Sequence, residues 1–333
     1  MEYNNLGNTG VKVSGLCYGT MTFGKEADEE TSAAMFKRCR EAGVNFFDCA
    51  NVYVGGRSEE ILGKLIAGSR DEIIITSKFY FPTGKDINAR GASRRHMMNA
   101  LESSLKRLNT DYIDIYFIHH FDDETPLEET LRALDDLVRQ GKILYIGASN
   151  FAAWQIAKGL GISAKEGWAR FECIQPMYNL VKRQAEVEIL PLALSENLSV
   201  IPYSPIAAGL LSGKYSTPRK PESGRLLENQ LYKNRYGENW VYDVAERFAD
   251  FAKGHGFDPV SLAVAWVAHH PGVTAPIIGA RNLQQLEGSL GSLEIQMDAT
   301  LYAEISALSP EPPPATDRIE ERAAITYQGA LAK

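Results

Sequence analysis

The sequence predicts an α/β protein with one domain, a (β/α)8 TIM barrel that spans residues 1–333. Three observations support this fold class. Short apolar segments alternate with longer amphipathic segments along the whole chain. The apolar segments do not alternate with polar residues, as is typical of parallel strands buried on both faces. The length of 333 residues accommodates the roughly 250 residues of a typical barrel, and no change in composition divides it.

Eight segments have the short apolar character of buried strands. They are residues 14–19, 45–48, 73–78, 112–119, 143–149, 171–175, 199–204 and 274–279. The first six are followed by segments with helical spacing, residues 30–43, 58–68, 93–108, 126–141, 151–162 and 185–197. Crossovers of this length return the chain in the same direction, so we expect parallel strands. Gly43 and Gly141 are predicted to end two of the helices, because glycine favours the left-handed cap conformation.

Two segments stand outside the repeating pattern. Residues 212–239 follow the seventh predicted strand and form a long stretch rich in glycine, proline and charge. This stretch exceeds an ordinary connection, so we expect a functional loop or a mobile lid that becomes ordered when a cofactor binds. From about residue 310 the sequence contains EPPP and is predicted to be an extended tail.

Composition narrows the classes of partner. The net charge is −7 and the isoelectric point is near 5.5, which disfavours nucleic acid and anionic membrane surfaces. Four cysteines without a CxxC pair predict reduced thiols in the cytoplasm. No apolar segment reaches the ~18 residues that span a bilayer. We therefore expect a cytoplasmic protein that binds a small molecule, and a homo-oligomer remains possible.

Three short patterns resemble functional motifs but lack the context that those motifs require. Residues 159–164 fit G-x-G-x-x-A but follow a helical segment, so they lack the strand–turn–helix context of a dinucleotide site. Tyr178 and Lys182 fit Tyr-x-x-x-Lys, but the chain has no glycine-rich segment near its start to accompany that pair. His119 and His120 are adjacent on a predicted strand and point to opposite faces. No metal site is predicted, since no third ligand stands at matching spacing.

Four chemically active residues stand at the ends of consecutive predicted strands. Asp48 closes the second strand, Tyr53 follows it, Lys78 closes the third and His119 closes the fourth. Because barrel enzymes carry out chemistry at the carboxyl ends of their strands, we expect these side chains to converge there. An Asp48–Lys78 pair would offset the cost of burying either charge. We expect the ammonium to lower the pKa of Tyr53, which would act as proton donor while His119 orients a carbonyl oxygen.

The spacing Asp48-x4-Tyr53, with Lys78 and His119, resembles the catalytic tetrad of the aldo-keto reductases. The resemblance extends to GVNFFDCANVYVGGRSEEILG, RGASRRHMMNALESSLKRLNTDYIDIYFIH, GASNF, QPMYNL and IPYSPIAAGLLSGKY. It implies reduction of aldehydes or ketones, including sugar or aromatic carbonyls, to alcohols with NAD(P)H. In that reaction Tyr53 would be the general acid, Lys78 and Asp48 would tune it, and His119 would position the substrate.

The resemblance also implies a cofactor bound across the barrel mouth without a Rossmann motif. Its contacts would come from Gly19, Thr20, Met21, Asp48, Ser149, Asn150, Gln175, Tyr203, Ser204, Pro205, Ile206, Gly209, Leu210, Ser212, Lys214, Gly279, Arg281, Gln285 and Ser289. Arg281 suits the 2′-phosphate of NADP, so NADP(H) is favoured and NAD(H) remains possible. Many relatives carry Glu-Asn where this chain has Gly288-Ser289, which leaves the strength of that preference open.

Two questions stay open at the level of sequence. The substrate pocket is expected to be lined by residues just past the strand ends, namely Phe23, Tyr53, Phe79, Phe81, His119 and His120. Such a lining suits aromatic aldehydes and sugars alike. The second question is whether the protein is an enzyme. The chain also resembles potassium-channel β subunits, so the alternative is a cofactor-binding regulatory or redox-sensing module. Those subunits typically lack a histidine at the position of His119, so its presence favours an enzyme.

Overall fold

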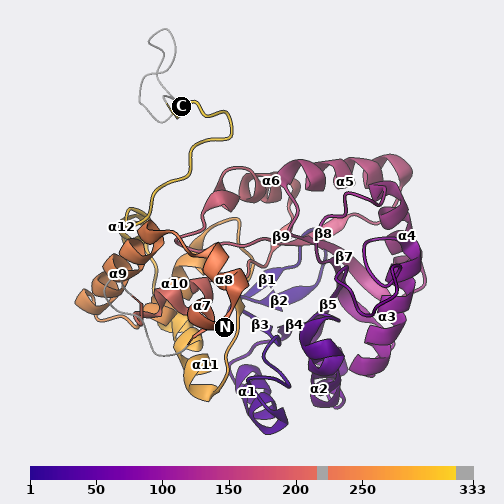
Figure 1. Cartoon of the computed structure of the whole chain (residues 1–333), viewed down its shortest axis with the longest axis horizontal. Coiled ribbons are helices and arrows are strands. Elements are labelled where there is room, and N and C mark those ends of the chain that lie inside the picture. The colour runs from indigo at the N-terminus through magenta and orange to yellow at the C-terminus, as the bar shows by residue number, and fades with distance from the viewer. Residues whose placement is uncertain (216–223, 320–333) are drawn as a thin grey trace.

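The computed structural model describes residues 1–215 and 224–319 and shows one barrel of parallel strands surrounded by helices (Figure 1). Eight strands form a sheet in the order β10-β3-β4-β5-β6-β7-β8-β9, and each laddered pair is parallel. The strands are β3 (Cys17–Gly19), β4 (Phe46–Asp48), β5 (Ile74–Phe79), β6 (Ile113–Ile118), β7 (Ile143–Ser149), β8 (Phe171–Gln175), β9 (Ser199–Val200) and β10 (Ile277–Ile278). The predicted fold class and all eight predicted strand positions are confirmed.

The barrel closes between β9 and β10 through single hydrogen bonds rather than a ladder. The Thr274 amide donates to the Val200 carbonyl over 2.8 Å, and the Ile277 amide donates to the Pro202 carbonyl over 2.9 Å. Both strands are shorter than predicted. Pro202 lacks the N–H that would continue pairing toward β10, because alternate residues of a strand face opposite neighbours.

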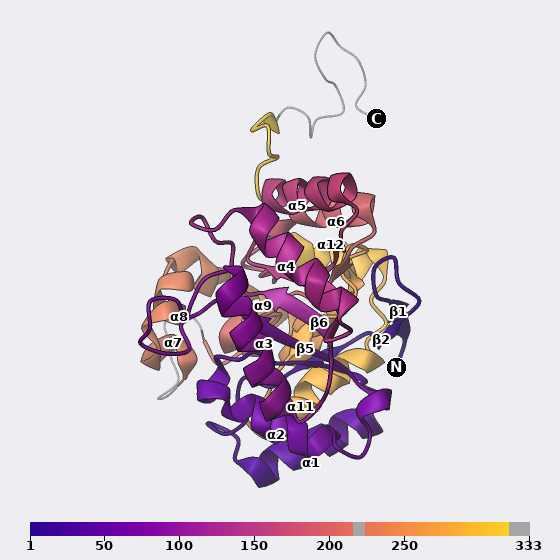
Figure 2. The same cartoon turned by 90° about the vertical axis from the view of Figure 1, so that its right-hand side faces the viewer.

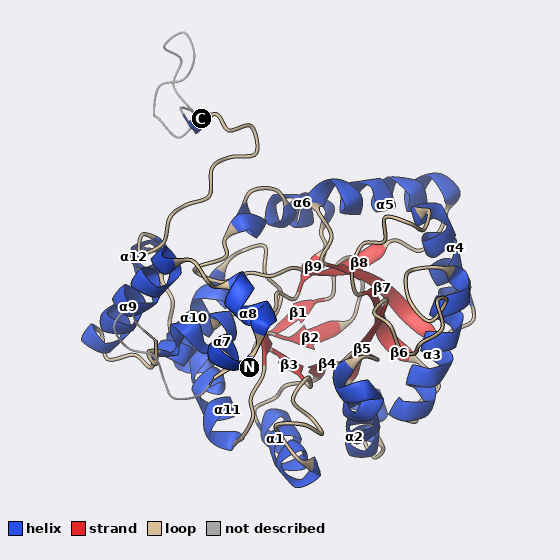
Figure 3. Cartoon of the chain, viewed as in Figure 1, coloured by secondary structure: helices blue, strands red, loops and turns tan. Residues whose placement is uncertain are grey.

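Helices cover the outside of the barrel (Figure 3). They are α1 (Glu29–Glu41), α2 (Arg57–Ile66), α3 (Arg94–Leu108), α4 (Leu127–Arg139), α5 (Ala153–Glu166), α6 (Ile189–Glu196), α7 (Arg225–Glu228), α8 (Gln230–Arg235), α9 (Asn239–Gly254), α10 (Pro259–His269), α11 (Leu283–Leu290) and α12 (Ala299–Ser306). Side-chain caps begin several of them, as at Asp28 and Ser93, which accept from the amides of Thr31 and His96. Gly43 and Gly141 end α1 and α4 with positive φ angles of 86° and 70°, as predicted.

An antiparallel hairpin precedes the barrel and was not predicted. Strands β1 (Tyr3–Asn5) and β2 (Lys12–Ser14) pair with each other. Leu6, which follows β1, and Val13, in β2, are fully buried. These two side chains pack in one cluster with Cys17 and Phe46, the first residues of β3 and β4. The hairpin therefore closes the amino-terminal end of the barrel and leaves the carboxyl end as the mouth. Its short polar strands carry no pattern that sequence could reveal.

The long segment at 212–239 contains short helices that the sequence did not predict. Its described parts contain α7 and α8, and residues 216–223 lie outside the described residues. Leu226 and Tyr236 are 3% and 1% exposed, and the Asn179 amide donates to the Tyr236 hydroxyl over 3.2 Å. Leu226 and Tyr236 therefore pack the described parts of the segment into the core cluster.

The end of the described chain leaves the barrel. From residue 310 to residue 319 it runs outward from α12 in both views (Figures 1 and 2), as the tail prediction expected. Residues 320–333 of the predicted tail lie outside the described residues. Within residues 1–215 and 224–319, each helix is too short or too polar to cross a bilayer.

Candidate active site

The four predicted catalytic residues lie together at the barrel mouth. Asp48 ends β4, Lys78 is the penultimate residue of β5, and His119 directly follows β6. Tyr53 begins a short 3-10 helix, η1 (Tyr53–Gly56), between β4 and α2. The parallel register aligns these strand ends, so the four side chains meet at the end of the barrel opposite the hairpin.

The Lys78 ammonium is the most enclosed charge in this site. Its side chain is fully buried, and Nζ donates to both carboxylate oxygens of Asp48, each over 2.7 Å. A third bond of 2.7 Å runs to the carbonyl of Cys49. The fourth neighbour is the Tyr53 hydroxyl at 3.5 Å. Three hydrogen bonds therefore fix the ammonium, and the phenol lies beside it.

The Asp48 carboxylate is held by more donors than the sequence indicated. Besides Lys78, its Oδ1 accepts from the Thr76 hydroxyl over 2.6 Å and from the Gln175 amide over 2.8 Å. Sequence reasoning missed Thr76. It lies two residues before Lys78 on β5, and period-two alternation places both side chains on the same face of the strand. That signal was available in the sequence.

The electrostatics of Tyr53 differ in one respect from the prediction. Burial raises the pKa of the phenol to about 12, and the nearby Lys78 only partly offsets this by lowering it. Burial destabilises the phenolate by more than the nearby ammonium stabilises it. Lys78 lowers the pKa in the expected direction, but burial outweighs this effect, so Tyr53 is protonated throughout the physiological pH range.

Lys78 and His119 have settled charge states. Burial alone would lower the pKa of the Lys78 ammonium, but Asp48 and Tyr53 raise it above its usual value. Burial lowers the pKa of His119 well below its usual value, and Lys78 and His120 lower it further. The site therefore holds a cationic lysine and a neutral imidazole. The His119 Nδ1 atom is buried and has no hydrogen-bond partner in the described structure.

A left-handed backbone turn brings Tyr53 to the mouth. Val54, Gly55 and Gly56 have φ angles of 50°, 63° and 98°. Such angles are uncommon for a β-branched residue such as Val54. This turn reverses the chain between β4 and α2, and the Tyr53 ring then lies edge-on to His119 with their centroids 6.1 Å apart.

Polar side chains on the next strands continue the site around the mouth. The Asn150 amide donates to the carbonyl of His119 over 2.9 Å, and its Oδ1 accepts from the Tyr203 hydroxyl over 2.8 Å. The Ser149 hydroxyl donates to the carbonyl of Gln175 over 3.0 Å. Asn150 has a φ of 57°, a conformation that asparagine tolerates better than most residues. These contacts join the ends of β7 and β8 to the segment after β9.

The segment after β9 has an unusual backbone. The 3-10 helix η4 (Ala207–Ser212) includes Ala207, Ala208 and Gly209 with φ angles of 50°, 58° and 96°. Consecutive left-handed residues are costly for alanine. The amides of Ala207 and Gly209 donate to the carbonyls of Ser204 and Ile206, each over 2.9 Å. A side chain built on Gly209 would meet open space, so this hydrogen-bonded turn borders an open region.

Other predicted cofactor residues are distributed around the same rim. Gly19 ends β3 and is followed by Thr20 and Met21, and Gly279 and Arg281 follow β10. The Arg281 amide donates to the Gln285 side chain over 3.1 Å. Among these residues, Thr20, Leu210 and Ser289 are buried, with 0%, 0% and 3% of their surface exposed. Pro205, Ile206, Ser212 and Lys214 lie within or beside η4.

Two of the six predicted pocket residues do not face the mouth, and their assignment is corrected. Phe23 and Phe79 are fully buried. Phe79 stacks on Tyr116 at 5.1 Å and packs near His96 of α3, because it alternates with Lys78 and points toward the helices. Phe23 packs on Tyr18 at 5.8 Å.

The remaining aromatic residues gather beside His119. Phe81 lies edge-on to the His119 ring at 4.9 Å, and Tyr80 stacks on His120 at 5.4 Å. Tyr80 has a φ of 147°, which is rare outside glycine and occurs mainly where surrounding structure enforces it. Together with Tyr53 they form an aromatic wall on one side of the site.

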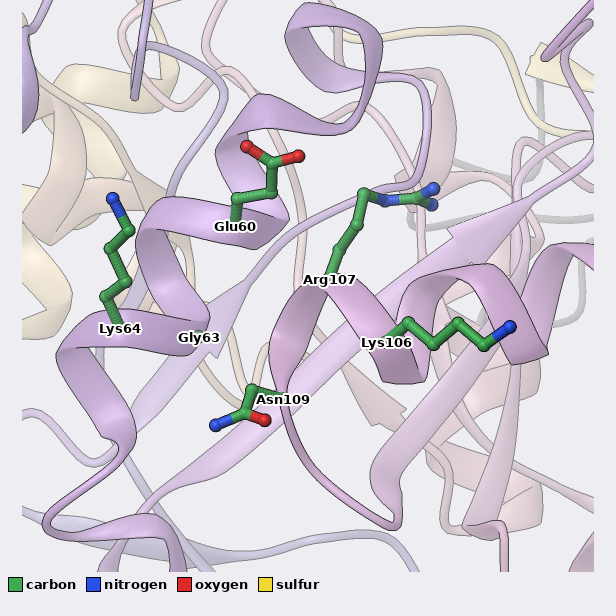
Figure 4. A pocket seen from close by; sticks show the side chains of 6 residues that line it. All are labelled: Glu60, Gly63, Lys64, Lys106, Arg107 and Asn109. Carbon is green, nitrogen blue, oxygen red and sulfur yellow. The ribbon is translucent and has the colours of Figure 1, made fainter.

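Outside the mouth, a groove of about 400 Å³ lies between α2 and α3 (Figure 4). Its lining residues are Glu60, Gly63, Lys64, Lys106, Arg107 and Asn109. No predicted site residue lines this groove. Within the described residues, no group of three or more histidine, cysteine, aspartate or glutamate side chains is arranged to hold a metal ion.

Comparison with known proteins identifies the family. The model of the aldo/keto reductase family matches residues 15–310. An uncharacterized oxidoreductase, YrpG, of Bacillus subtilis is 36% identical over 94% of this chain and 97% of its own length. A probable voltage-gated potassium channel subunit beta of Oryza sativa is 36% identical over 89% and 92%. Versiconal hemiacetal acetate reductase of Aspergillus parasiticus is 33% identical over 89% and 94%. The chain belongs to the aldo/keto reductase family and is an oxidoreductase.

Proposed function

We propose that this protein reduces aldehydes or ketones to alcohols with NADPH and that Tyr53 donates the proton. The observation that carries the proposal is the 3.5 Å approach of the Lys78 ammonium to the Tyr53 hydroxyl in a site where the phenol is protonated. A protonated phenol beside a fixed cation is a proton donor whose phenolate product is stabilised as it forms. Membership of the aldo/keto reductase family supports the same reaction class.

The residues of the mouth fit a nicotinamide cofactor, which the family uses. The left-handed turn at Ala207, Ala208 and Gly209 borders open space, and the diphosphate of the cofactor would lie against it. Asn150 and Ser149 offer amide and hydroxyl groups near the site, where they would hold the carboxamide. Arg281 would contact the 2′-phosphate of NADPH. When bound there, the cofactor supplies the hydride.

Each residue of the tetrad has a definable task in this reaction. The carbonyl oxygen of the substrate accepts hydrogen bonds from Tyr53 and from neutral His119, which orients the carbonyl carbon. As negative charge develops on the oxygen, Tyr53 transfers its proton and the product is an alcohol. Lys78 stabilises the tyrosinate left behind, and Asp48 holds Lys78 in place with two bonds of 2.7 Å. The aromatic wall of Tyr80 and Phe81 favours planar aromatic aldehydes.

The proposal is tested by following the loss of NADPH absorbance with a panel of aromatic aldehydes, keto sugars and quinones. We expect turnover with aromatic aldehydes at the highest kcat/KM. The Tyr53→Phe variant serves as the control for background reduction. Equal rates for the wild type and this variant with every compound would contradict the proposal.

A second function is favoured by one observation, the likeness to a probable potassium channel β subunit. A regulatory module would bind the cofactor and report its redox state to a partner, with no need for rapid turnover. The neutral, buried His119 beside Tyr53 supports the enzyme instead. Steady-state turnover over many cycles in the isolated protein separates the two functions.

A further inference from the structure

A fully buried carboxylate lies behind the active site. Glu59, in the first turn of α2, has no exposed surface. Its Oε1 accepts from the Ser77 hydroxyl over 2.5 Å, and its Oε2 accepts from Arg107 Nε over 2.7 Å. Ser77 is the neighbour of Lys78 on β5. Burying a carboxylate is costly unless it is paired and hydrogen-bonded, and here both conditions hold.

Ser58, the residue before Glu59, connects the same end of α2 to the ends of β3 and β4. The Ser58 hydroxyl lies 2.8 Å from the carbonyl of Thr20 and 2.9 Å from the Thr20 hydroxyl. The Thr20 hydroxyl donates in turn to the Asp48 carbonyl over 3.0 Å. Ser58 and Glu59 therefore join the start of α2 to β3, β4 and β5 at the level of the catalytic residues.

Arg107 covers the turn that carries Tyr53. A side chain built on Gly56 would meet Arg107 Cδ at 2.7 Å and Nε at 2.8 Å. Gly56 is the last residue of η1, the segment that Tyr53 begins. Figure 4 shows Arg107 extending from α3 beside the turn of α2 that carries Glu60. The guanidinium thus packs on the Tyr53 turn from outside while it pairs with Glu59.

From these contacts we infer that Glu59 and Arg107 are positioning residues that hold the Tyr53 turn at its working distance from Lys78. The Glu59 carboxylate connects β5, through Ser77, to α3, through Arg107, and Arg107 closes over Gly56. Three residues with positive φ lie between Tyr53 and α2. Because this backbone conformation is unfavourable by itself, the position of the turn depends on the residues that pack against it. This inference rests on the proposed function, because it assigns the pair to the support of proton donation.

The chain offers a matched control pair. Arg70 Nη2 and Asp114 Oδ2 are 2.8 Å apart, and their side chains are 13% and 7% exposed. Asp114 also accepts from the amide of Ile75 over 2.9 Å. Like the Glu59–Arg107 pair, it is a buried ion pair bonded to β5. Its contact with β5 is at Ile75, three residues before Lys78 and away from the Tyr53 turn. Loss of either pair should lower stability, and only loss of the first should move Tyr53.

The experiment compares Glu59→Gln and Arg107→Lys with Asp114→Asn in the full chain. The first readout is the NMR signal of Tyr53 in protein labelled at tyrosine Cζ, assigned by its absence in Tyr53→Phe. The second is the single-turnover rate of NADPH oxidation with an aromatic aldehyde. A displacement of about 1 Å can cost roughly 100-fold in rate. We expect a shifted or broadened Tyr53 signal and about a 10- to 100-fold slower single turnover in the first two variants, with both readouts unchanged in Asp114→Asn.

The outcomes are distinguishable. An unchanged Tyr53 signal and rate in folded Glu59→Gln and Arg107→Lys would overturn the inference, as would equal changes in Asp114→Asn. If Glu59→Gln does not fold, Arg107→Lys carries the same test, because lysine keeps the charge but cannot cover Gly56 with a guanidinium. If the wild type reduces no carbonyl compound, the proposed function fails and the NMR signal still decides the positioning role.

Discussion

The Lys78 ammonium and the Tyr53 hydroxyl lie 3.5 Å apart at the carboxyl end of the barrel. The ammonium cannot move away, because Asp48 and the Cys49 carbonyl hold it with three bonds of 2.7 Å. A cation fixed before the reaction costs no reorganisation when charge appears on the neighbouring oxygen. The pair is therefore the centre from which the following predictions are made.

Removing the cation should affect stability as well as rate. Lys78→Met leaves the Asp48 carboxylate buried without its ion-pair partner, and breaking such a pair typically costs about 3–5 kcal/mol. We expect the free energy of unfolding, measured in urea, to fall by that order. The double variant Asp48→Asn/Lys78→Met should recover much of this loss while remaining inactive. Recovery of activity along with stability would contradict the role of Lys78.

The charge states of Tyr53 and His119 predict an unusual pH profile. A phenol with its pKa raised to about 12 keeps its proton as pH rises through the alkaline range, so reduction is lost only near that value. Because the pKa of His119 is lowered, the imidazole stays neutral as pH falls through its ordinary titration range. We expect kcat/KM to show no break between about pH 6 and pH 9, where free histidine and cysteine titrate. A break near pH 6.5 that disappears in His119→Asn would refute these charge states.

Cofactor preference is predicted to depend on Arg281. Charge-assisted bonds to phosphate contribute about 1.5–3 kcal/mol, which corresponds to tenfold or more in kcat/KM for NADPH over NADH. Arg281→Ala should remove this preference by weakening NADPH alone. Arg38→Ala is the matched control, since Arg38 is an arginine that pairs with Glu287 of α11. Equal efficiency of the two cofactors with the wild type would exclude the preference.

Substitutions of Phe81 and Phe79 should have different effects, because Phe81 belongs to the aromatic wall and Phe79 to the core. Phe81→Ala should raise KM for aromatic aldehydes, because Phe81 packs edge-on to His119 at the mouth. Phe79→Ala should instead destabilise the fold by about 3–5 kcal/mol, the usual cost of removing a buried phenylalanine. Substrate titrations and urea unfolding measure the two effects. A loss of stability in Phe81→Ala as large as in Phe79→Ala would place Phe81 in the core.

Sequence predicted those parts of the molecule that depend on order along the chain. Strand ends are visible as the last residues of apolar segments, so the sequence predicts that Asp48, Lys78 and His119 lie at one mouth of the barrel. Which way a neighbouring side chain faces was also available from alternation, and applying it would have kept Phe79 in the core and found Thr76. The direction of the pKa shift of Tyr53 could not be predicted from the sequence, because it depends on how completely the phenol is removed from water.

Long-range packing was the other obstacle. Glu59 and Arg107 stand 48 positions apart, and nothing in either local pattern indicates that α2 and α3 bring them together. The hairpin of β1 and β2 was missed for a different reason, since its polar three-residue strands lack a hydrophobic period. The helices α7 and α8 were missed because glycine, proline and charge obscure the few apolar residues that anchor them.

The central claim is that the Tyr53 hydroxyl delivers the proton to the carbonyl oxygen. Tyr53→Phe removes that hydroxyl and leaves the ring that packs near His119. Loss of one general acid typically costs about 10²- to 10⁴-fold. The most direct measurement is the single-turnover rate of NADPH oxidation with an aromatic aldehyde in the wild type and in Tyr53→Phe, with NADPH affinity measured separately by fluorescence. The account predicts a rate lowered by that factor with affinity unchanged. A Tyr53→Phe rate equal to that of the wild type would contradict it.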